Sequence, residues 1–262
     1  MQAPRVAALA MYDAPPLDAA NDDLWAAIAA RVPGAPAKLT RDRPVESVWT
    51  APGLVLAQAC GWPLITRLAG QVRLVATACY ALPGCAGATH CGFIVVRAAD
   101  PARALEDLRG RRLALNTWDS NTGMNLLRAA VAPLARNGRF FSAVYVTGTH
   151  AASLRAVAAG GADVTSVDCV TFGVLKRHRP ADVAGLRVLA HTPTSPGLPL
   201  ITRGDVSAAE LGALRAALCA TRDSPAAHAL GLTGFEILPA AAYEVLREME
   251  AEAVRRGYAA LA

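Results

Sequence analysis

The chain is 262 residues long, with 53% hydrophobic and 18% charged residues, which excludes a disordered or coiled-coil protein. Its 26 Lys and Arg residues exceed its 21 Asp and Glu residues, for a net charge of +5, but the arginines are scattered and no aromatic-studded basic stripe accompanies them. We therefore expect no nucleic-acid partner. No apolar run approaches the ~20 residues needed to cross a membrane.

Strand and helix patterns alternate from the N-terminus onward. A helix from Asn21 places apolar residues four apart on one face, and a turn-rich stretch occupies residues 82–89. Apolar runs predict strands over residues 5–11, 53–58, 72–79 and 92–97.

The pattern restarts near residue 98. A helix is expected from Asp100-Pro101 to Gly110, and strands follow over 113–115, 144–146 and 162–167. Single helices separate these three strands, so they should pair in parallel through right-handed crossovers. Their C-terminal ends would then share one edge of the sheet.

The last part of the chain is a return strand followed by helices. The strand is expected over 186–190, residues 191–199 are too rich in proline for a regular element, and the chain is helical from Ser207.

Two α/β units of this kind predict an α/β protein with two lobes, each a mainly parallel sheet flanked by helices, and a ligand cleft between the lobes. The first lobe is expected to be discontinuous, comprising residues 1–95 and 191–262, and the second to comprise residues 96–190. The chain would cross between the lobes near 91–97 and 186–202.

The shared edge of the three parallel strands collects polar residues, and open α/β sheets bind their ligands there. The helix after the first of these strands begins with Ser120, Asn121, Thr122 and Gly123. One helix cap needs fewer small polar residues, and the glycine lets a ligand approach the backbone. Free N–H groups beside hydroxyls suit an anion such as phosphate or a carboxylate. The alternative is an ordinary N-cap without a ligand.

Two more candidates follow the second and third strands. Thr149 and His150 begin the next helix, where the helix dipole disfavours the charged imidazole, so a neutral His150 would donate one hydrogen bond to an oxyanion. Asp168 ends the third strand. It is either a cap for the helix beginning near Thr171 or an acceptor for a protonated oxygen or an amine of the ligand.

Catalytic and metal-binding motifs are missing from the sequence. Ser120 lacks a Gly-x-Ser-x-Gly elbow, and neither cysteine spacing nor a His-x-x-x-His pair supports a metal. We expect no catalysis, no metal and no cofactor; a thiol-dependent enzyme using Cys91 or Cys169 is an alternative. A disulfide between Cys60 and Cys85 is compatible with an oxidising compartment.

Six segments occur in the order typical of one known family, over residues 5–205. They are Leu54-Val55-Leu56-Ala57-Gln58, Gly92-Phe93-Ile94-Val95-Val96-Arg97, Leu105-Glu106-Asp107-Leu108-Arg109-Gly110, Asp119-Ser120-Asn121-Thr122-Gly123, Gly148-Thr149-His150 and Val167-Asp168. Through them the chain resembles the phosphate, phosphite and phosphonate-binding proteins of ABC transporters, a branch of the type II periplasmic binding fold.

The resemblance implies two lobes that close over a ligand and perform no chemistry. The positions matching the family's ligand-binding residues are Ser120, Asn121, Thr122, His150 and Asp168, with Tyr12 and Tyr80 as cleft aromatics. One segment departs from the family: Thr89-His90-Cys91 stands where a Tyr-x-Ser segment is usual. This departure replaces two hydroxyls and adds His90 to the expected ligand residues.

We therefore expect a solute-binding protein that captures a small phosphonate-, phosphite- or phosphate-like oxyanion, acting as a monomer with an ABC transporter permease as its partner. The alternative is the same fold binding a sulfonate, a carboxylate or an aromatic precursor as a sensor or scavenger. The resemblance implies a periplasmic location if a signal peptide was removed. The cytoplasm is expected if Met1 is the native start, since the sequence shows no signal peptide.

Overall fold

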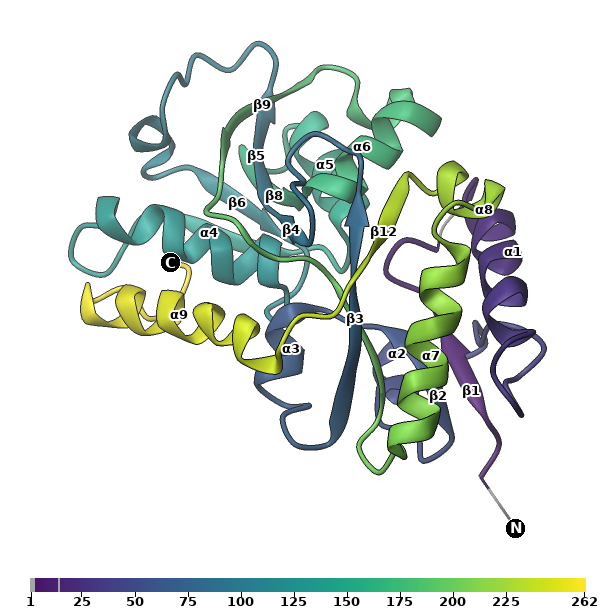
Figure 1. Cartoon of the computed structure of the whole chain (residues 1–262). Coiled ribbons are helices and arrows are strands. Elements are labelled where there is room, and N and C mark those ends of the chain that lie inside the picture. The colour runs from purple at the N-terminus through teal and green to yellow at the C-terminus, as the bar shows by residue number, and fades with distance from the viewer. Residues whose placement is uncertain (1–2, 14) are drawn as a thin grey trace. The chain divides into compact units, whose positions relative to one another are not determined.

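The chain folds into two compact units, seen in a computed structural model that describes residues 3–13 and 15–262 (Figure 1). Unit 1 comprises residues up to 81, 86–88 and 196–242, and unit 2 comprises residues 82–85, 89–195 and 243–262.

These units differ from the expected lobes mainly at two places, and residues 82–85 and 191–195, expected in the first lobe, also belong to unit 2. The segment 243–262 belongs to unit 2, where α9 (Val245–Arg255) packs along α4 (Leu126–Val131), as Figure 1 shows. The strand β5 (Gly92–Arg97) also lies entirely within unit 2 and is flanked there by two other strands, so it is not a crossover.

Unit 1 is built on a mixed five-stranded sheet. Its strands, in spatial order, are β1 (Val6–Ala8), β2 (Leu54–Gln58), β11 (Pro199–Arg203), β3 (Val72–Tyr80) and β12 (Leu232–Glu236). β1 and β2 are parallel, whereas β11 is antiparallel to both of its neighbours and β12 is antiparallel to β3. The expected mainly parallel sheet is therefore mixed, because β11 and β12 join it only after the chain has passed through unit 2.

The helices of unit 1 cover this sheet. They are α1 (Asp18–Ala29), α2 (Val45–Trp49), α3 (Gly61–Ile65), α7 (Ala208–Thr221) and α8 (Pro225–Ala229). α1 packs against α7 and α8 (Figure 1) and buries Leu24, Trp25 and Ile28. α2 packs against β1 and β2, where Val48 and Trp49 join the apolar core.

Unit 2 has its own mixed sheet. Its strands, in spatial order, are β7 (Ala143–Val146), β6 (Arg112–Leu115), β8 (Val164–Asp168), β5 and β9 (Leu186–His191). β6 is parallel to β7 and to β8, which confirms the shared edge predicted for these three strands. β5 is antiparallel to β8, in a register that pairs Gly92 with Asp168.

The remaining elements are short. In unit 2 they are η1 (Leu105–Leu108), η2 (Asn121–Asn125), η3 (Ala132–Leu134), α5 (His150–Ala158), α6 (Cys169–His178) and η4 (Pro180–Val183), while β4 (Thr89–His90), β10 (Ser195–Pro196) and η5 (Ala240–Glu244) lie where the chain passes from one unit to the other. Within the described residues, no helix is long and apolar enough to span a membrane.

Two predicted elements differ from the structure. The helix expected over 100–110 is reduced to η1, because the Asp107 carboxylate accepts hydrogen bonds from the N–H groups of Arg103 and Ala104 and so caps a single turn. β12 was expected to be helical, but it contains Gly234 with φ +152°, which a helix does not accommodate.

A buried arginine secures the C-terminal segment within unit 2. Arg128 donates from Nη1 to the Ala259 carbonyl oxygen at 2.8 Å and from Nη2 to Asn125 Oδ1 at 2.7 Å. Asn125 Nδ2 donates in turn to the carbonyl oxygen of Leu246 at 3.2 Å. These bonds attach α9 and the chain end to the helix that starts beside Ser120.

A second network closes the opposite end of the unit 2 sheet. Asp163, directly before β8, accepts hydrogen bonds from the backbone N and Nε of Arg112, both at 3.0 Å, and from Nη2 of Arg97 at 3.3 Å. The Arg112 side-chain hydrogen bond is the main cause that lowers the pKa of Asp163.

We expect Asp163→Asn to lower the free energy of unfolding by about 2 kcal/mol at pH 7. This loss is smaller than that for a fully buried ion pair, because both arginines are partly exposed to solvent. Since the folded pKa lies below the unfolded value of ~3.9, this stabilisation is present above about pH 4 and is lost as the pH falls through the folded pKa. Urea unfolding at pH 7 and pH 3 measures it. Asp205→Asn, which removes an exposed ion pair with Arg203, is the control and should change stability by less than about 0.5 kcal/mol. A destabilisation by Asp163→Asn that is equal at both pH values would contradict the linkage.

Candidate functional site

The helix after β6 begins as the sequence predicts. Ser120 is its N-cap, and its Oγ accepts a hydrogen bond from the Gly123 N–H at 3.0 Å. The first turn, η2, is π-helical, with the Asn125 N–H donating to the Ser120 carbonyl oxygen at 3.1 Å, and it continues directly into α4. A π-helical turn interrupts the α-helical ladder and is frequent at functional sites.

Gly123 is required by close packing at this helix start. A Cβ atom on Gly123 would lie 2.0 Å from Oδ1 of Asn116, whose side chain is buried against it. Any larger residue would displace Asn116 and disturb the Ser120 cap. The glycine that the sequence suggests for ligand access therefore also serves packing.

Hydrogen bonds tie the helix start to its neighbours in unit 2. The Thr122 carbonyl oxygen accepts from Ser166 Oγ at 2.7 Å, and Thr122 Oγ1 is hydrogen-bonded to His150 Nε2 at 3.3 Å. Asn121 Nδ2 donates to Ser195 Oγ at 3.0 Å. The Ser120 and His150 helix starts are thus brought together, as predicted from the shared edge of the sheet.

The second helix start presents a neutral histidine. Thr149 is the N-cap of α5 and its side chain accepts from the Ala152 N–H at 3.1 Å. His150 is the first helical residue, and burial lowers its pKa to about 4. The neutral imidazole is a donor at only one nitrogen at physiological pH.

Asp168 ends β8 and makes two kinds of contact. Its Oδ1 accepts hydrogen bonds from the N–H groups of Val170 and Thr171 at 2.8 and 3.0 Å, which caps α6. Its Oδ2 lies 3.0 Å from Nδ1 of His90, and both side chains are buried. Of the two roles that the sequence allows for Asp168, the structure shows the helix cap. The second carboxylate oxygen binds His90 of this chain.

The pairing changes the protonation of both groups. Burial opposes a charged His90, but the hydrogen bond and charge of Asp168 outweigh it and raise the pKa of the imidazole. Burial also opposes a charged Asp168 and by itself would raise the pKa of this carboxyl. The hydrogen bond and charge of His90 outweigh burial and lower the pKa of Asp168 below its ordinary value. The structure favours an ionised pair, imidazolium and carboxylate, with no net charge.

One ring nitrogen of this pair is buried without a hydrogen-bond partner among residues 3–13 and 15–262. His90 is 3% exposed, and its Nε2 has no hydrogen-bond partner among the described residues. A buried donor without a partner costs about 1–3 kcal/mol, a cost that a ligand oxygen bound to Nε2 would remove. Since Nδ1 faces Asp168, Nε2 carries a proton and can donate it to an oxyanion.

One known protein family matches most of this chain. Residues 63–243, more than half of the chain, match the family model of the ABC transporter phosphonate periplasmic substrate-binding proteins. The chain belongs to this family. A comparison with curated proteins by sequence gives no significant match.

Solved structures share the fold of this phosphonate-binding family member. A binding-protein component of an ABC phosphonate transporter from Pseudomonas aeruginosa is 15% identical, with a TM-score of 0.77 over 97% of this chain and 88% of that one. PhnD1 from Prochlorococcus marinus in complex with methylphosphonate is 12% identical, with a TM-score of 0.71 over 96% and 98%. A Xanthomonas citri protein with bound ATP is 16% identical, with a TM-score of 0.66 over 97% and 98%. The fold is that of the type II periplasmic binding proteins.

The two predicted aromatics of the family member belong to unit 1. The rings of Tyr12 and Tyr80 are in edge-on contact, with centroids 5.4 Å apart, and Gln58 Nε2 donates to the Tyr80 hydroxyl at 3.2 Å. All other predicted site residues lie in unit 2. A ligand cleft between lobes stays a prediction.

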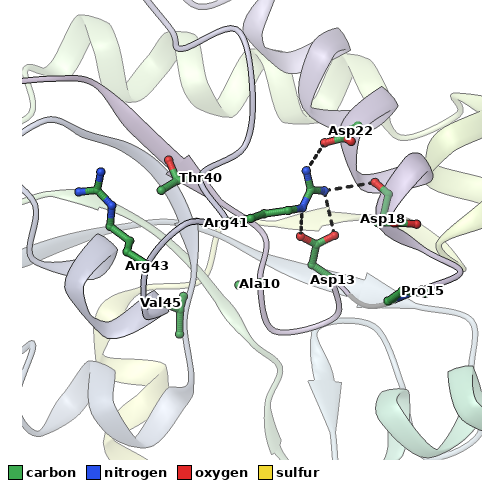
Figure 2. A pocket seen from close by; sticks show the side chains of 9 residues that line it. All are labelled: Ala10, Asp13, Pro15, Asp18, Asp22, Thr40, Arg41, Arg43 and Val45. Atoms are coloured by element: carbon green, nitrogen blue, oxygen red, sulfur yellow. Dashed lines mark hydrogen bonds and ion pairs between the residues drawn. The ribbon is translucent and has the colours of Figure 1, made fainter.

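A separate hollow of unit 1 does not suit an anion. The pocket in Figure 2 has a volume of about 340 Å³, and its central guanidinium is that of Arg41. Asp13 binds Arg41 at 2.5 and 3.0 Å, and Asp22 binds it at 2.6 Å. The carboxylates of the lining, Asp13, Asp18 and Asp22, outnumber its arginines, Arg41 and Arg43, so this pocket offers little positive charge to a ligand.

Three polar residues around the helix start were not predicted. Asn116 packs on Gly123, Ser166 holds the Thr122 carbonyl, and Ser195 accepts from Asn121. The sequence does indicate Ser166, because Thr165 and Ser166 are polar residues between Val164 and Val167 of a strand that is buried throughout. Ser195 lies in the proline-rich segment 191–199, where no sequence pattern indicates a site residue.

The cysteines are arranged differently from the expected disulfide. None of the six is in a disulfide, and the thiol next to Cys85 is that of Cys169, with 3.5 Å between the sulfur atoms, so the expected bond between Cys60 and Cys85 is not formed. Among residues 3–13 and 15–262, no cluster of three or more His, Cys, Asp or Glu side chains could hold a metal ion.

Proposed function

We propose that this solute-binding protein captures a small phosphorus oxyanion of the phosphonate class with donors of unit 2. The donors come from three places: the helix start at Ser120–Gly123, the helix start at Thr149–His150, and Nε2 of His90. Groups approaching from three elements suit a tetrahedral anion, whose oxygens point in different directions, better than a planar carboxylate. Tyr12 and Tyr80 are proposed as further ligand contacts.

The observation that carries this proposal is the buried, unpartnered Nε2 of His90. Asp168 holds the other ring nitrogen at 3.0 Å and stabilises the imidazolium, so the free N–H is a charge-assisted donor. Asp168 then positions His90 instead of accepting a hydrogen bond from the ligand through Oδ2. This refines the role that the family resemblance implies for the carboxylate.

The family further implies delivery of the ligand to an ABC transporter permease in the periplasm. We propose that the chain does so as a monomer and without catalysis. The family match favours a phosphorus oxyanion over a sulfonate, a carboxylate or an aromatic precursor.

We expect a thermal-shift screen to identify the ligand class. A ligand at 100 times its Kd stabilises the native state by about 2.7 kcal/mol. Methylphosphonate, aminoalkylphosphonates, phosphite and phosphate are the test compounds, and methanesulfonate and acetate at equal ionic strength are the controls. A shift confined to the phosphorus compounds supports the proposal.

Two outcomes would contradict it. A larger shift with methanesulfonate or acetate would assign the site to another anion class. No shift with any phosphorus oxyanion at concentrations up to about 10 mM would exclude even weak capture. A ligand with a Kd of 1 mM, which is a binding free energy of only about −4.1 kcal/mol, would still be bound at that concentration.

A further inference from the structure

Three thiols gather in unit 2 next to the histidine–carboxylate pair. Cys91 follows His90 and Cys169 follows Asp168, and the Cys169 N–H donates to the Cys91 carbonyl oxygen at 3.1 Å. Cys85 comes from the preceding loop, and its Sγ lies 3.5 Å from Cys169 Sγ. The proposed ligand site uses none of these thiols.

The loop that carries Cys85 is held tightly against the start of α6. A Cβ atom on Gly84 would lie 2.8 Å from Cys169 Cβ, so the loop backbone touches the Cys169 side chain. Gly84 has φ +90°, a conformation that favours glycine and turns the chain here. A disulfide needs its sulfur atoms ~2.05 Å apart, so closing this gap takes a sulfur movement of about 1.5 Å.

Cys169 is fully buried beside the half-buried Cys85, and its place at a helix start makes it the better nucleophile of the two. It is the first residue of the ten-residue helix α6, where the helix dipole favours a thiolate. Hydrogen bonds from the Cys85 and Cys91 thiols lower its pKa. By contrast, burial raises the pKa of Cys79 to about 11, so that thiol should stay inert.

We propose that Cys85 and Cys169 are a thiol-oxidation site, which forms a reversible disulfide when the protein meets a hydroperoxide. The Cys169 sulfur attacks the peroxide oxygen; an S–O bond forms, the O–O bond breaks, and hydrogen peroxide releases water once the leaving oxygen is protonated. The Cys85 sulfur then attacks the sulfenic sulfur of Cys169; the S–S bond forms, the S–O bond breaks, and the Cys85 proton leaves with the hydroxide as a second water. Two thiols lose two electrons and one peroxide gains them.

The test treats the full chain with a small excess of hydrogen peroxide, blocks the remaining thiols by alkylation and maps the disulfides by mass spectrometry with fragmentation. A Cys219→Ser background removes the exposed cysteine, which would otherwise link molecules. We expect free thiols to fall from five to three, a single link between Cys85 and Cys169, and full recovery with dithiothreitol. Cys91→Ser is the matched control from the same cluster and should form the same link.

Several results would overturn the inference. They are a link between Cys91 and Cys169 in the otherwise unchanged chain, loss of the link in Cys91→Ser, irreversible oxidation of Cys169 as the main product, or five unreacted thiols. Cys85→Ser should remove the link and, in the presence of dimedone, leave a trapped sulfenic acid at Cys169. A trapped product at Cys91 alone would contradict the assignment of Cys169 as the nucleophile.

Discussion

Replacing Ser120 by aspartate is expected to abolish oxyanion binding while leaving the helix cap in place. Aspartate caps a helix about as well as serine, so the hydrogen bond from Gly123 N–H at 3.0 Å has an acceptor in the variant. The same carboxylate, however, sets a negative charge at the proposed anion site and removes the hydroxyl donor. Like charges in a desolvated site cost several kcal/mol, so we expect methylphosphonate affinity to fall at least about 100-fold.

Isothermal titration with methylphosphonate measures this loss. Ser224→Asp is the matched control, because Ser224 caps α8 by accepting from the Ala227 N–H at 3.2 Å in the same way, but in unit 1. It should bind methylphosphonate like the unchanged chain. Ser120→Ala completes the set: it loses the cap, at a cost of about 1 kcal/mol in stability, and weakens binding less than aspartate does. Equal affinity of Ser120→Asp and Ser224→Asp would exclude the Ser120 helix start as the anion site.

Asp168→Asn is expected to cause the largest loss of stability, about 3 kcal/mol in the free energy of unfolding. The amide oxygen of asparagine can still accept from the N–H groups of Val170 and Thr171, so the cap of α6 survives. Its NH₂ group, however, would face Nδ1 of His90, which lies 3.0 Å from Oδ2 in the native pair. Removing one partner of a buried ion pair leaves the other buried and uncompensated, which typically costs 3–5 kcal/mol.

The pH dependence of this loss distinguishes the pair from a simple cap. His90 has a raised folded pKa, so its contribution is complete below about pH 6.5 and is lost as the pH rises through the folded pKa. Asp168 has a lowered folded pKa, so its contribution is present above about pH 4 and is lost as the pH falls through the folded pKa. The destabilisation should therefore be largest between these limits and smaller at pH 9.

Urea unfolding at pH 5.5 and pH 9 checks this expectation. His90→Gln and the double variant complete a thermodynamic cycle, and the coupling between the two positions should be at least about 1 kcal/mol at pH 5.5. A destabilisation that is the same at both pH values, or additive single variants, would show that Asp168 acts only as a helix cap.

The elements of the fold were largely predictable where they are locally encoded. β2 and β5 are continuous apolar runs, and the structure buries nearly all of their residues. The parallel arrangement of β6, β7 and β8 follows from the single helices between them. The placement of 243–262 was not predictable, because it depends on Arg128, which binds Ala259 and Glu250 far along the chain.

Local chemistry in the sequence by itself determined the starts of the helices that carry the candidate site. Ser120, Thr149 and Asp168 cap η2, α5 and α6, because a capping side chain bonds to N–H groups only two or three residues away. Only the tertiary structure decided which side chains meet. His90 reaches Asp168 because β5 and β8 pair antiparallel with Gly92 opposite Asp168, and Cys85 meets Cys169 across 84 residues. Strand register and loop packing are long-range properties that no local pattern encodes, so the buried donor of His90 becomes visible only in the folded chain.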